Sequence, residues 1–248
     1  MTTLRPPRLT LRNVHMVTSG VMLHDLNLHI VSEQLCLFLG DATSSALLRV
    51  LAGQLVTAVG AIYLDDDDVA NLSPSKMRDH GVAYLPVAHA DPPPASPARA
   101  TLRGLAGTDA AAELALQCLT LDPDAPTTLL TGADAAAFAV AVAFVTGARV
   151  LLLDGYASRL DPPGYAALAR GLARLATASG AIVLCAEQSD TRTLRSGVCP
   201  VDRDLFDRTW YCEGGRARPW SISQPEPPPP WMIEHDAPPA PPSRRTRR

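Results

Sequence analysis

Four short, continuously apolar segments constrain the fold of this 248-residue chain more than any other feature. They read LCLFL at 35–39, GVAYLP at 81–86, RVLLLD at 149–154 and AIVLCA at 181–186. Apolar runs of this length, without polar alternation, are typical of strands buried on both faces of a sheet. Because helical patterns separate them, we predict an α/β fold whose core is a parallel sheet.

A second group of segments alternates apolar and polar residues. They are 9–14, 23–30 and 61–69, and the last ends in the acidic run DDDD. Alternation is typical of strands with one face in solvent, so we predict an antiparallel β lobe beside the core sheet. Residues 208–220 read as a further hairpin around a Gly-Gly turn. We expect the acidic run to be a solvated turn, rather than a metal site.

Helical spacing recurs at 44–53, in the alanine-rich stretch up to residue 120, at 133–144 and at 164–180. The segment 133–144 allows two interpretations, a helix buried in its own domain or an apolar face for a partner. From residue 220 the chain becomes proline-rich and ends in SRRTRR, which predicts a disordered tail over 220–248. The remaining residues, 1–219, are long enough for one domain, with a small helical lobe at about 88–147.

The composition of the chain excludes several classes of function. Hydrophobic residues make up 47% and charged residues 19% of the chain, which is enough apolar surface for a sizeable core. The net charge of -3 argues against a nucleic-acid partner. The five cysteines have no metal-ligand spacing, and we predict buried free thiols and no bound metal. No apolar run reaches the length of a membrane span, so we expect a soluble or peripheral protein.

The stretch ARVLLLDGYASRLDPPGYAAL, at 148–168, resembles the Walker B strand and D-loop of ABC-type ATPases. Other landmarks of that family occur along this chain in the family's order. They are the strand and glycine at 35–40, LLTGAD at 129–134 and VLCAE at 183–187. The resemblance covers about residues 8–219. It implies a P-loop NTPase-like ABC ATPase domain with a parallel core sheet, an antiparallel β lobe and a small helical lobe.

The resemblance places a phosphate-binding loop at the start of the helix near residue 44. The nucleotide-binding positions would be Gly40, Thr43, Ser44 and Ser45. A working loop is richer in glycine and carries a lysine for the phosphates. This loop is about two residues short and contains no lysine. The chain's one lysine, Lys76, lies beyond the next strand.

The same comparison assigns Asp154 to the position that holds the metal ion. The family's general-base glutamate is replaced by Gly155, its glutamine by Val87 and its switch histidine by Glu187. Glycine can neither accept a proton nor orient a water molecule. Asp41 adds a negative charge where phosphates would lie. We therefore expect no catalytic residue and no ATP hydrolysis in the chain's own site, and no cofactor bound there.

ABC domains pair head to tail, so that each ATP lies between one domain's P-loop and the other's signature loop. In this chain that loop reads LTGAD, in which Thr131 keeps a hydroxyl and Gly132 keeps a flexible N–H group. Asp161 keeps the D-loop carboxylate. These three residues would complete an ATP and magnesium site that belongs to a partner.

The resemblance implies a catalytically degenerate subunit of a membrane ABC transporter, at the cytoplasmic face of the cell membrane. Its partners would be an active ABC ATPase subunit and transmembrane subunits, and its role structural and regulatory. Two alternatives remain open: a soluble scaffold with this fold and no transporter, and a weak residual ATPase.

Overall fold

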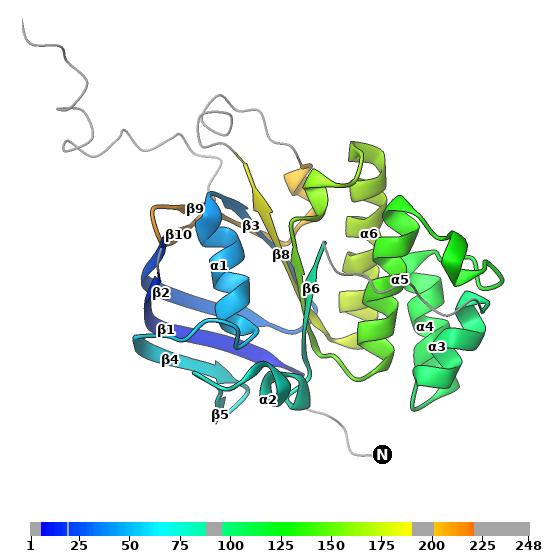
Figure 1. Ribbon diagram of the computed structural model, residues 1–248, viewed down its shortest axis with the longest axis horizontal. Helices are drawn as coiled ribbons and strands as arrows, with labels where there is room; N and C mark the ends of the chain where they lie inside the picture. Colours follow the sequence, from blue (N-terminus) through cyan, green and yellow to red (C-terminus); the bar gives the residue numbers. More distant parts are fainter. Residues whose placement is uncertain (1–5, 19, 88–95, 190–200, 221–248) are drawn as a thin grey trace, which may run out of the picture.

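The computed structural model describes residues 6–18, 20–87, 96–189 and 201–220. A six-stranded sheet forms the core, in the order β10-β9-β3-β8-β7-β6 (Figure 1). Its bounds are β3 Leu35–Gly40, β6 Val82–Pro86, β7 Val150–Asp154, β8 Ile182–Gln188, β9 Arg208–Glu213 and β10 Arg216–Pro219. All neighbours pair in parallel except β9 and β10, which form an antiparallel hairpin. The four apolar segments are thus neighbouring strands, and the predicted parallel core is confirmed.

The second sheet is antiparallel, in the order β2-β1-β4-β5. It comprises β1 Arg8–Thr18, β2 Val21–Val31, β4 Val59–Leu64 and the short β5 Asp67–Asp68. The predicted strand over 61–69 is therefore two strands. The chain turns at Asp65, whose backbone has φ +59°, a conformation that Asp tolerates better than most residues.

Helices cover both faces of the core sheet. On one side lie α1 Ala42–Leu51 and the antiparallel sheet, with α2 Pro74–Asp79 at its edge (Figure 1). On the other lie α3 Ala98–Leu105, α4 Asp109–Leu119, α5 Gly132–Val145 and α6 Pro162–Ser179. Short 3-10 turns are η1 Thr127–Leu129, η2 Tyr156–Ser158 and η3 Arg203–Leu205. The predicted helices over 44–53 and 164–180 correspond to α1 and α6, each within two residues at its ends.

Alternate residues of β3 face different layers. Leu35, Leu37 and Leu39 pack into the cluster with α4, α5 and α6, whereas Cys36 and Phe38 pack into the cluster with α1 and the antiparallel sheet. Successive side chains of a strand point to opposite faces of its sheet. All six residues of β3 are buried, so the strand's C-terminal end, where the candidate site begins, is fixed by packing on both sides.

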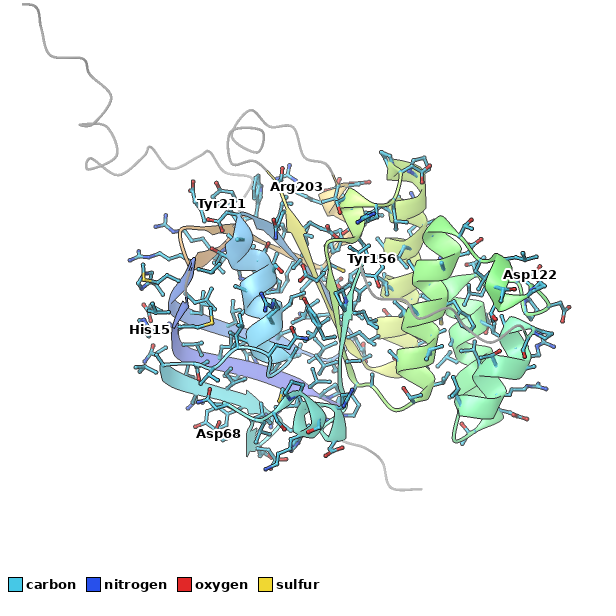
Figure 2. All side chains as sticks on the ribbon, viewed as in Figure 1. His15, Asp68, Asp122, Tyr156, Arg203 and Tyr211 are labelled. Carbon is cyan, nitrogen blue, oxygen red and sulfur yellow. The ribbon has the colours of Figure 1, made fainter. Side chains whose placement is uncertain are left out.

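Helix α5 packs against α4 and α6. Its larger side chains are buried or half-buried, and Phe138, Val140 and Val145 belong to the apolar core. This favours the interpretation of 133–144 as a helix buried in its own domain over that of an apolar face for a partner. Figure 2 shows the neighbouring Tyr156 inside the molecule, between the core sheet and these helices.

The acidic run corrects one prediction. Asp65 is not simply solvated: its carboxylate accepts a hydrogen bond from the backbone N–H of Arg8 at 2.9 Å and forms an ion pair with Arg149. That pair links the antiparallel sheet to the start of β7. Asp66 and Asp68 remain exposed.

Four cysteines are buried free thiols, as predicted: Cys36, Cys118, Cys185 and Cys212. Cys199 and the predicted tail at 221–248 lie outside the described residues. In the described part of the chain, none of the helices combines the length and apolarity that crossing a bilayer requires.

Candidate functional site

The site predicted from the sequence starts where β3 ends. A single residue, Asp41, separates Gly40 at the end of the strand from Ala42 at the start of α1. Gly40 is required by close packing, because a Cβ atom there would lie 1.8 Å from the carbonyl oxygen of Cys212 in β9. No loop is therefore left between strand and helix to surround a phosphate group with N–H donors, which is how such loops bind phosphate.

The carboxylate of Asp41 holds this junction together. One oxygen, Oδ1, accepts the backbone N–H of Thr43 at 2.8 Å and caps α1. The other, Oδ2, accepts the backbone N–H of Gly214 at 2.8 Å, in the turn between β9 and β10. A carboxylate at a helix N-terminus also interacts favourably with the helix dipole. Both oxygens are thus committed to backbone donors of the chain itself.

The hydroxyls of the first helical turn are also used internally. The Thr43 Oγ1 accepts the backbone N–H of Gly215 at 3.0 Å. The Ser44 hydroxyl donates to the carbonyl oxygen of Asp41 at 2.9 Å and is fully buried. Thr43 is buried as well. The structure brings together the four predicted nucleotide-binding positions. However, Gly40 is packed against Cys212, and the hydroxyls of Thr43 and Ser44 form hydrogen bonds within the protein.

Asp154, the predicted metal position, ends β7 beside α1. Its Oδ2 accepts hydrogen bonds from the Ser45 hydroxyl at 2.5 Å and from the Tyr84 hydroxyl at 2.6 Å. Burial and the neighbouring Asp154 carboxylate raise the pKa of Tyr84, so this phenol stays protonated and remains a donor. The residues near Asp154 thus supply one carboxylate and two hydroxyls, of which the sequence comparison missed Tyr84.

Two replaced catalytic positions lie together next to Asp154. The backbone N–H of Val87 donates to the carbonyl oxygen of Asp154 at 3.1 Å, and Gly155 is the next residue. Gly155 has φ +80°, and a Cβ atom there would lie 3.6 Å from the Cγ1 atom of Val87. The side chains present at this point are apolar or absent, so neither can move a proton or orient a water molecule.

Glu187, at the switch position, is 2% exposed near the end of β8. Its Oε2 accepts the backbone N–H of Ala157 at 2.9 Å, in the turn that leads from β7 towards Asp161. Desolvation by burial is the main cause that raises its pKa to about 8. A carboxyl group at this position therefore braces the turn after β7, rather than facing an open site.

The predicted partner-facing residues lie at the starts of α5 and α6. Thr131, Gly132 and Asp161 are all exposed. Thr131 is the N-cap of α5 but makes no side-chain cap hydrogen bond, whereas Asp161 caps α6 by accepting the N–H of Gly164 at 3.2 Å. A Cβ atom on Gly164 would lie 3.4 Å from that of Ala133, so the two helix starts are adjacent.

Sequence reasoning missed the contribution of the β9–β10 turn. Gly214 and Gly215 donate to Asp41 and Thr43 across more than 170 residues of sequence, and the carbonyl oxygen of Gly215 accepts the backbone N–H of His24 in β2 at 2.7 Å. The available signal was the Gly-Gly pair itself, since glycine allows the close backbone approach that a Cβ atom would prevent. Nothing in the local sequence shows that the turn lies over α1.

Comparisons with known proteins agree with this fold. No protein-family model matches the sequence. The chain is 30% identical, over 186 residues and 70% of its length, to an uncharacterized ABC transporter ATP-binding protein of Sinorhizobium fredii (strain NBRC 101917 / NGR234). The matched region spans about half of that relative, 54%.

Solved structures of ATP-binding cassettes have the same fold. The ADP conformation of a cassette from an ABC transporter superposes with a TM-score of 0.66 at 16% identity, covering 86% of this chain and 89% of that one. A dimeric cassette in a post-hydrolysis state, bound to ADP and Pi, superposes with a TM-score of 0.60 at 17% identity. That superposition covers 85% of this chain and 98% of the cassette. The order of its strands and these superpositions show that the chain has the fold of an ATP-binding cassette, and its sequence is similar to that of an ABC transporter ATP-binding protein.

Proposed function

We propose that this chain is a subunit of a membrane ABC transporter that does not hydrolyse ATP in its own P-loop site. In this proposal it lies at the cytoplasmic face of the membrane, next to transmembrane subunits. It pairs with an active ABC ATPase subunit and completes that subunit's ATP site. The name of its relative, an ABC transporter ATP-binding protein, supports the transporter context.

The observation that carries the proposal is the position of the Asp41 carboxylate. It lies at the N-terminus of α1 and bonds Thr43 and Gly214 through both of its oxygens. A nucleotide phosphate at this place would have to displace a carboxylate from two backbone donors. If the carboxylate stayed, two like charges about 4 Å apart would repel each other by about 4 kcal/mol at an effective dielectric constant of 20.

Two further features support the absence of hydrolysis. No lysine lies in α1, and Lys76 is exposed on α2. Removing one strong electrostatic donor from a transition state costs about 3 kcal/mol or more. Gly155 and Val87 supply no base next to Asp154. A chain with this set of groups would need an entirely different arrangement to activate water.

The starts of α5 and α6 support a role in a partner's site. Their donors and acceptors stay accessible: Gly132 and Thr131 are exposed, and so is Asp161. The first N–H groups of α5 have no side-chain cap, so they are available to an anion that a partner brings. This contrasts with α1, whose cap is occupied.

The test is purification of the tagged full chain from native membranes in mild detergent, with the co-purifying chains identified by mass spectrometry. We expect an intact ABC ATPase and a multi-span membrane protein. Recovery of the chain alone, or with soluble proteins only, contradicts the transporter proposal and favours a soluble scaffold.

A second measurement on that complex tests the partner role. We expect Gly132→Glu to lower the ATPase rate of the complex, because it places a carboxylate at the start of α5. The control is Gly107→Glu, another exposed glycine of the same lobe, which should leave the rate unchanged. Equal rates for both variants contradict the role of the α5 start. Hydrolysis by this chain alone that Asp154→Asn abolishes would instead support a weak residual ATPase.

A further inference from the structure

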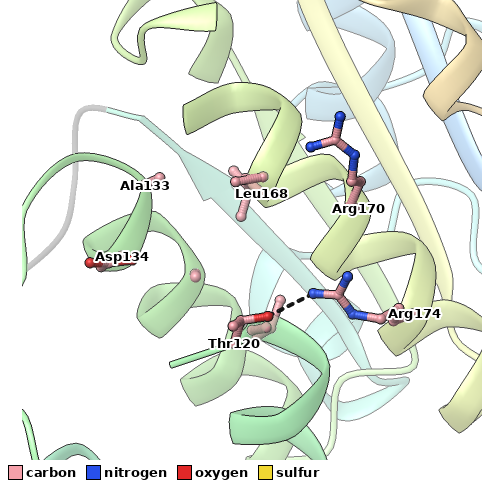
Figure 3. A pocket seen from close by; sticks show the side chains of 9 residues that line it. Thr120, Ala133, Asp134, Leu168, Arg170 and Arg174 are labelled. Carbon is pink, nitrogen blue, oxygen red and sulfur yellow. Dashed lines mark hydrogen bonds between the residues drawn. The ribbon is translucent and has the colours of Figure 1, made fainter. Parts of the chain in front are cut away.

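A hollow of about 330 Å³ lies between α4, α5 and α6, away from the α1 site. Figure 3 shows it from close by, with Arg170 and Arg174 of α6 on one side and Asp134 of α5 on the other. Its volume is at the lower end of the range for small-molecule sites, roughly 300–1,000 Å³. Two of the residues that line it, Ala133 and Asp134, end the LTGAD loop, and the others lie outside the positions discussed above for nucleotide or partner binding.

The floor and walls of the hollow are apolar. Ala137 and Ala167 leave the space open because their side chains are short, and Leu119 and Leu168 form its larger apolar walls. Contact with such walls favours a ligand with a compact apolar body, because that surface leaves water on binding. An inorganic anion would gain nothing from this part of the hollow.

The two arginines supply a positive rim. Arg170 and Arg174 are four residues apart on α6, so they lie on the same face of the helix. In the stretches that the structure describes, neither forms an ion pair with a carboxylate. Like charges at this spacing repel each other, and an anion between them would relieve the repulsion.

Arg174 is already oriented. Its Nε donates to the carbonyl oxygen of Cys118 at 2.9 Å. One terminal nitrogen donates to the Thr120 hydroxyl at 2.8 Å, the bond that Figure 3 shows. These bonds hold the guanidinium across the C-terminal end of α4. Little side-chain entropy is left to lose when a ligand binds, which favours binding.

The net charge of the lining residues determines which charge on an anion fits best. Two arginines and one aspartate leave a net charge of +1, which matches a monoanion better than a dianion. A guanidinium also fits the planar oxygens of a carboxylate. We propose that the hollow between α4, α5 and α6 binds a small organic monocarboxylate, with its carboxylate at Arg170 and Arg174 and its apolar part against Leu119, Ala137 and Leu168.

The test uses hexanoate as the probe and the full chain as the protein. Titration is followed by backbone amide NMR shifts, and we expect saturable changes confined to α4, α5 and α6. Acetate lacks the apolar body and 1-hexanol lacks the charge, so each should bind at least tenfold more weakly. Binding as tight as that of hexanoate by either compound would overturn the assignment.

Two variants locate the probe. Arg170→Gln removes an exposed arginine that forms no hydrogen bond or ion pair with another described residue, and it should weaken the binding of hexanoate about tenfold. Ala167→Trp fills the hollow from its exposed rim and should abolish saturation.

Their matched controls are Arg78→Gln on α2 and Ala178→Trp near the end of α6, both exposed and outside the hollow. Both controls should bind hexanoate like the unmodified chain. Unchanged affinity in Arg170→Gln and Ala167→Trp, or no saturable binding at all, would overturn the proposal.

Discussion

The starts of α1 and α5 are two helix N-termini of one molecule, and they differ in whether a side chain caps them. At α1 the Asp41 carboxylate caps the helix, the β9–β10 turn donates to it, and Thr43 and Ser44 are buried. At α5 the N-cap Thr131 makes no side-chain cap hydrogen bond, and both Thr131 and Gly132 are exposed. The same kind of element is satisfied internally in one place and left accessible in the other.

The difference shows what a phosphate site needs besides a strand and a helix. A helix N-terminus binds anions only when its donors are unused. At α1 the Asp41 carboxylate caps the helix, whereas at α5 no side chain forms a cap hydrogen bond, although Asp134 lies in the first turn. The two helix starts therefore differ in whether their donors are free, and substitutions at either start test that difference.

The largest effect is expected from Gly40→Ala. The new Cβ atom would lie 1.8 Å from the carbonyl oxygen of Cys212, so β3 and β9 must separate. We expect a loss of more than about 3 kcal/mol in the free energy of unfolding, or no folded protein. The matched variant Gly132→Ala has no atom within 4 Å of the new Cβ and only a positive φ, so it should cost about 1–2 kcal/mol. Urea unfolding of both compares them, and equal losses would contradict the contrast.

The second largest loss in the free energy of unfolding is expected from Asp41→Ala. It removes the cap of α1 and leaves the N–H of Gly214 without its acceptor. We expect a loss of about 2–3 kcal/mol, the sum of an N-cap and a hydrogen bond to a charged group. Urea unfolding at neutral pH measures it. A loss below about 0.5 kcal/mol, the level of an ordinary surface substitution, would show that the carboxylate does not hold the junction.

Glu187 links the start of α1 to the turn that leads to α6, because its carbonyl oxygen accepts the Ser44 hydroxyl and its carboxylate accepts the backbone N–H of Ala157. Its pKa is about 8 in the folded protein and 4.5 in a model compound. The folded state thus binds more protons than the unfolded state between these values. Stability should fall as pH rises through this window, by up to about 1.4 kcal/mol per pH unit.

Glu187→Gln should remove that slope and keep an acceptor for Ala157. Urea unfolding at several pH values between 5.5 and 7.5 measures it, with the exposed Glu33→Gln as the control that keeps the slope. The same pH dependence in Glu187→Gln as in the unmodified chain would contradict the burial of this carboxyl.

The smallest effect is expected from Thr131→Ala. Since the Thr131 side chain makes no cap hydrogen bond, its removal should change the free energy of unfolding by less than about 0.5 kcal/mol. Chemical unfolding beside Asp41→Ala gives the direct comparison of the two N-caps. A loss as large as that of Asp41→Ala would mean that the start of α5 is also satisfied internally.

The sequence was sufficient for the elements of the fold, because their periodicity is local. Continuous apolar runs marked the core strands, and Gly180 marked the end of α6, which it caps with φ +76°. Contacts between distant segments could not be predicted. The donors from Gly214 and Gly215 and the pairing of Asp65 with Arg149 depend on how the sheets pack, and no local pattern encodes that.

The candidate site was predictable as a set of positions, but not as a geometry. The motif order identified Gly40, Ser45 and Asp154, and the structure brings these together. What the sequence showed as a short loop with an added charge is a junction of one residue whose carboxylate bonds two backbone donors. Tyr84 was missed because a tyrosine within an apolar strand looks like a core residue until its hydroxyl is placed on Asp154.

The most direct test of the central claim is a calorimetric titration of the purified full chain with Mg²⁺ and ATP. If Asp41 occupies the N-terminus of α1, no saturable binding should appear below about 1 mM nucleotide, a binding free energy weaker than about -4 kcal/mol. Stoichiometric binding with a Kd in the micromolar range would contradict the claim, because it would require the α1 donors to be free for phosphate.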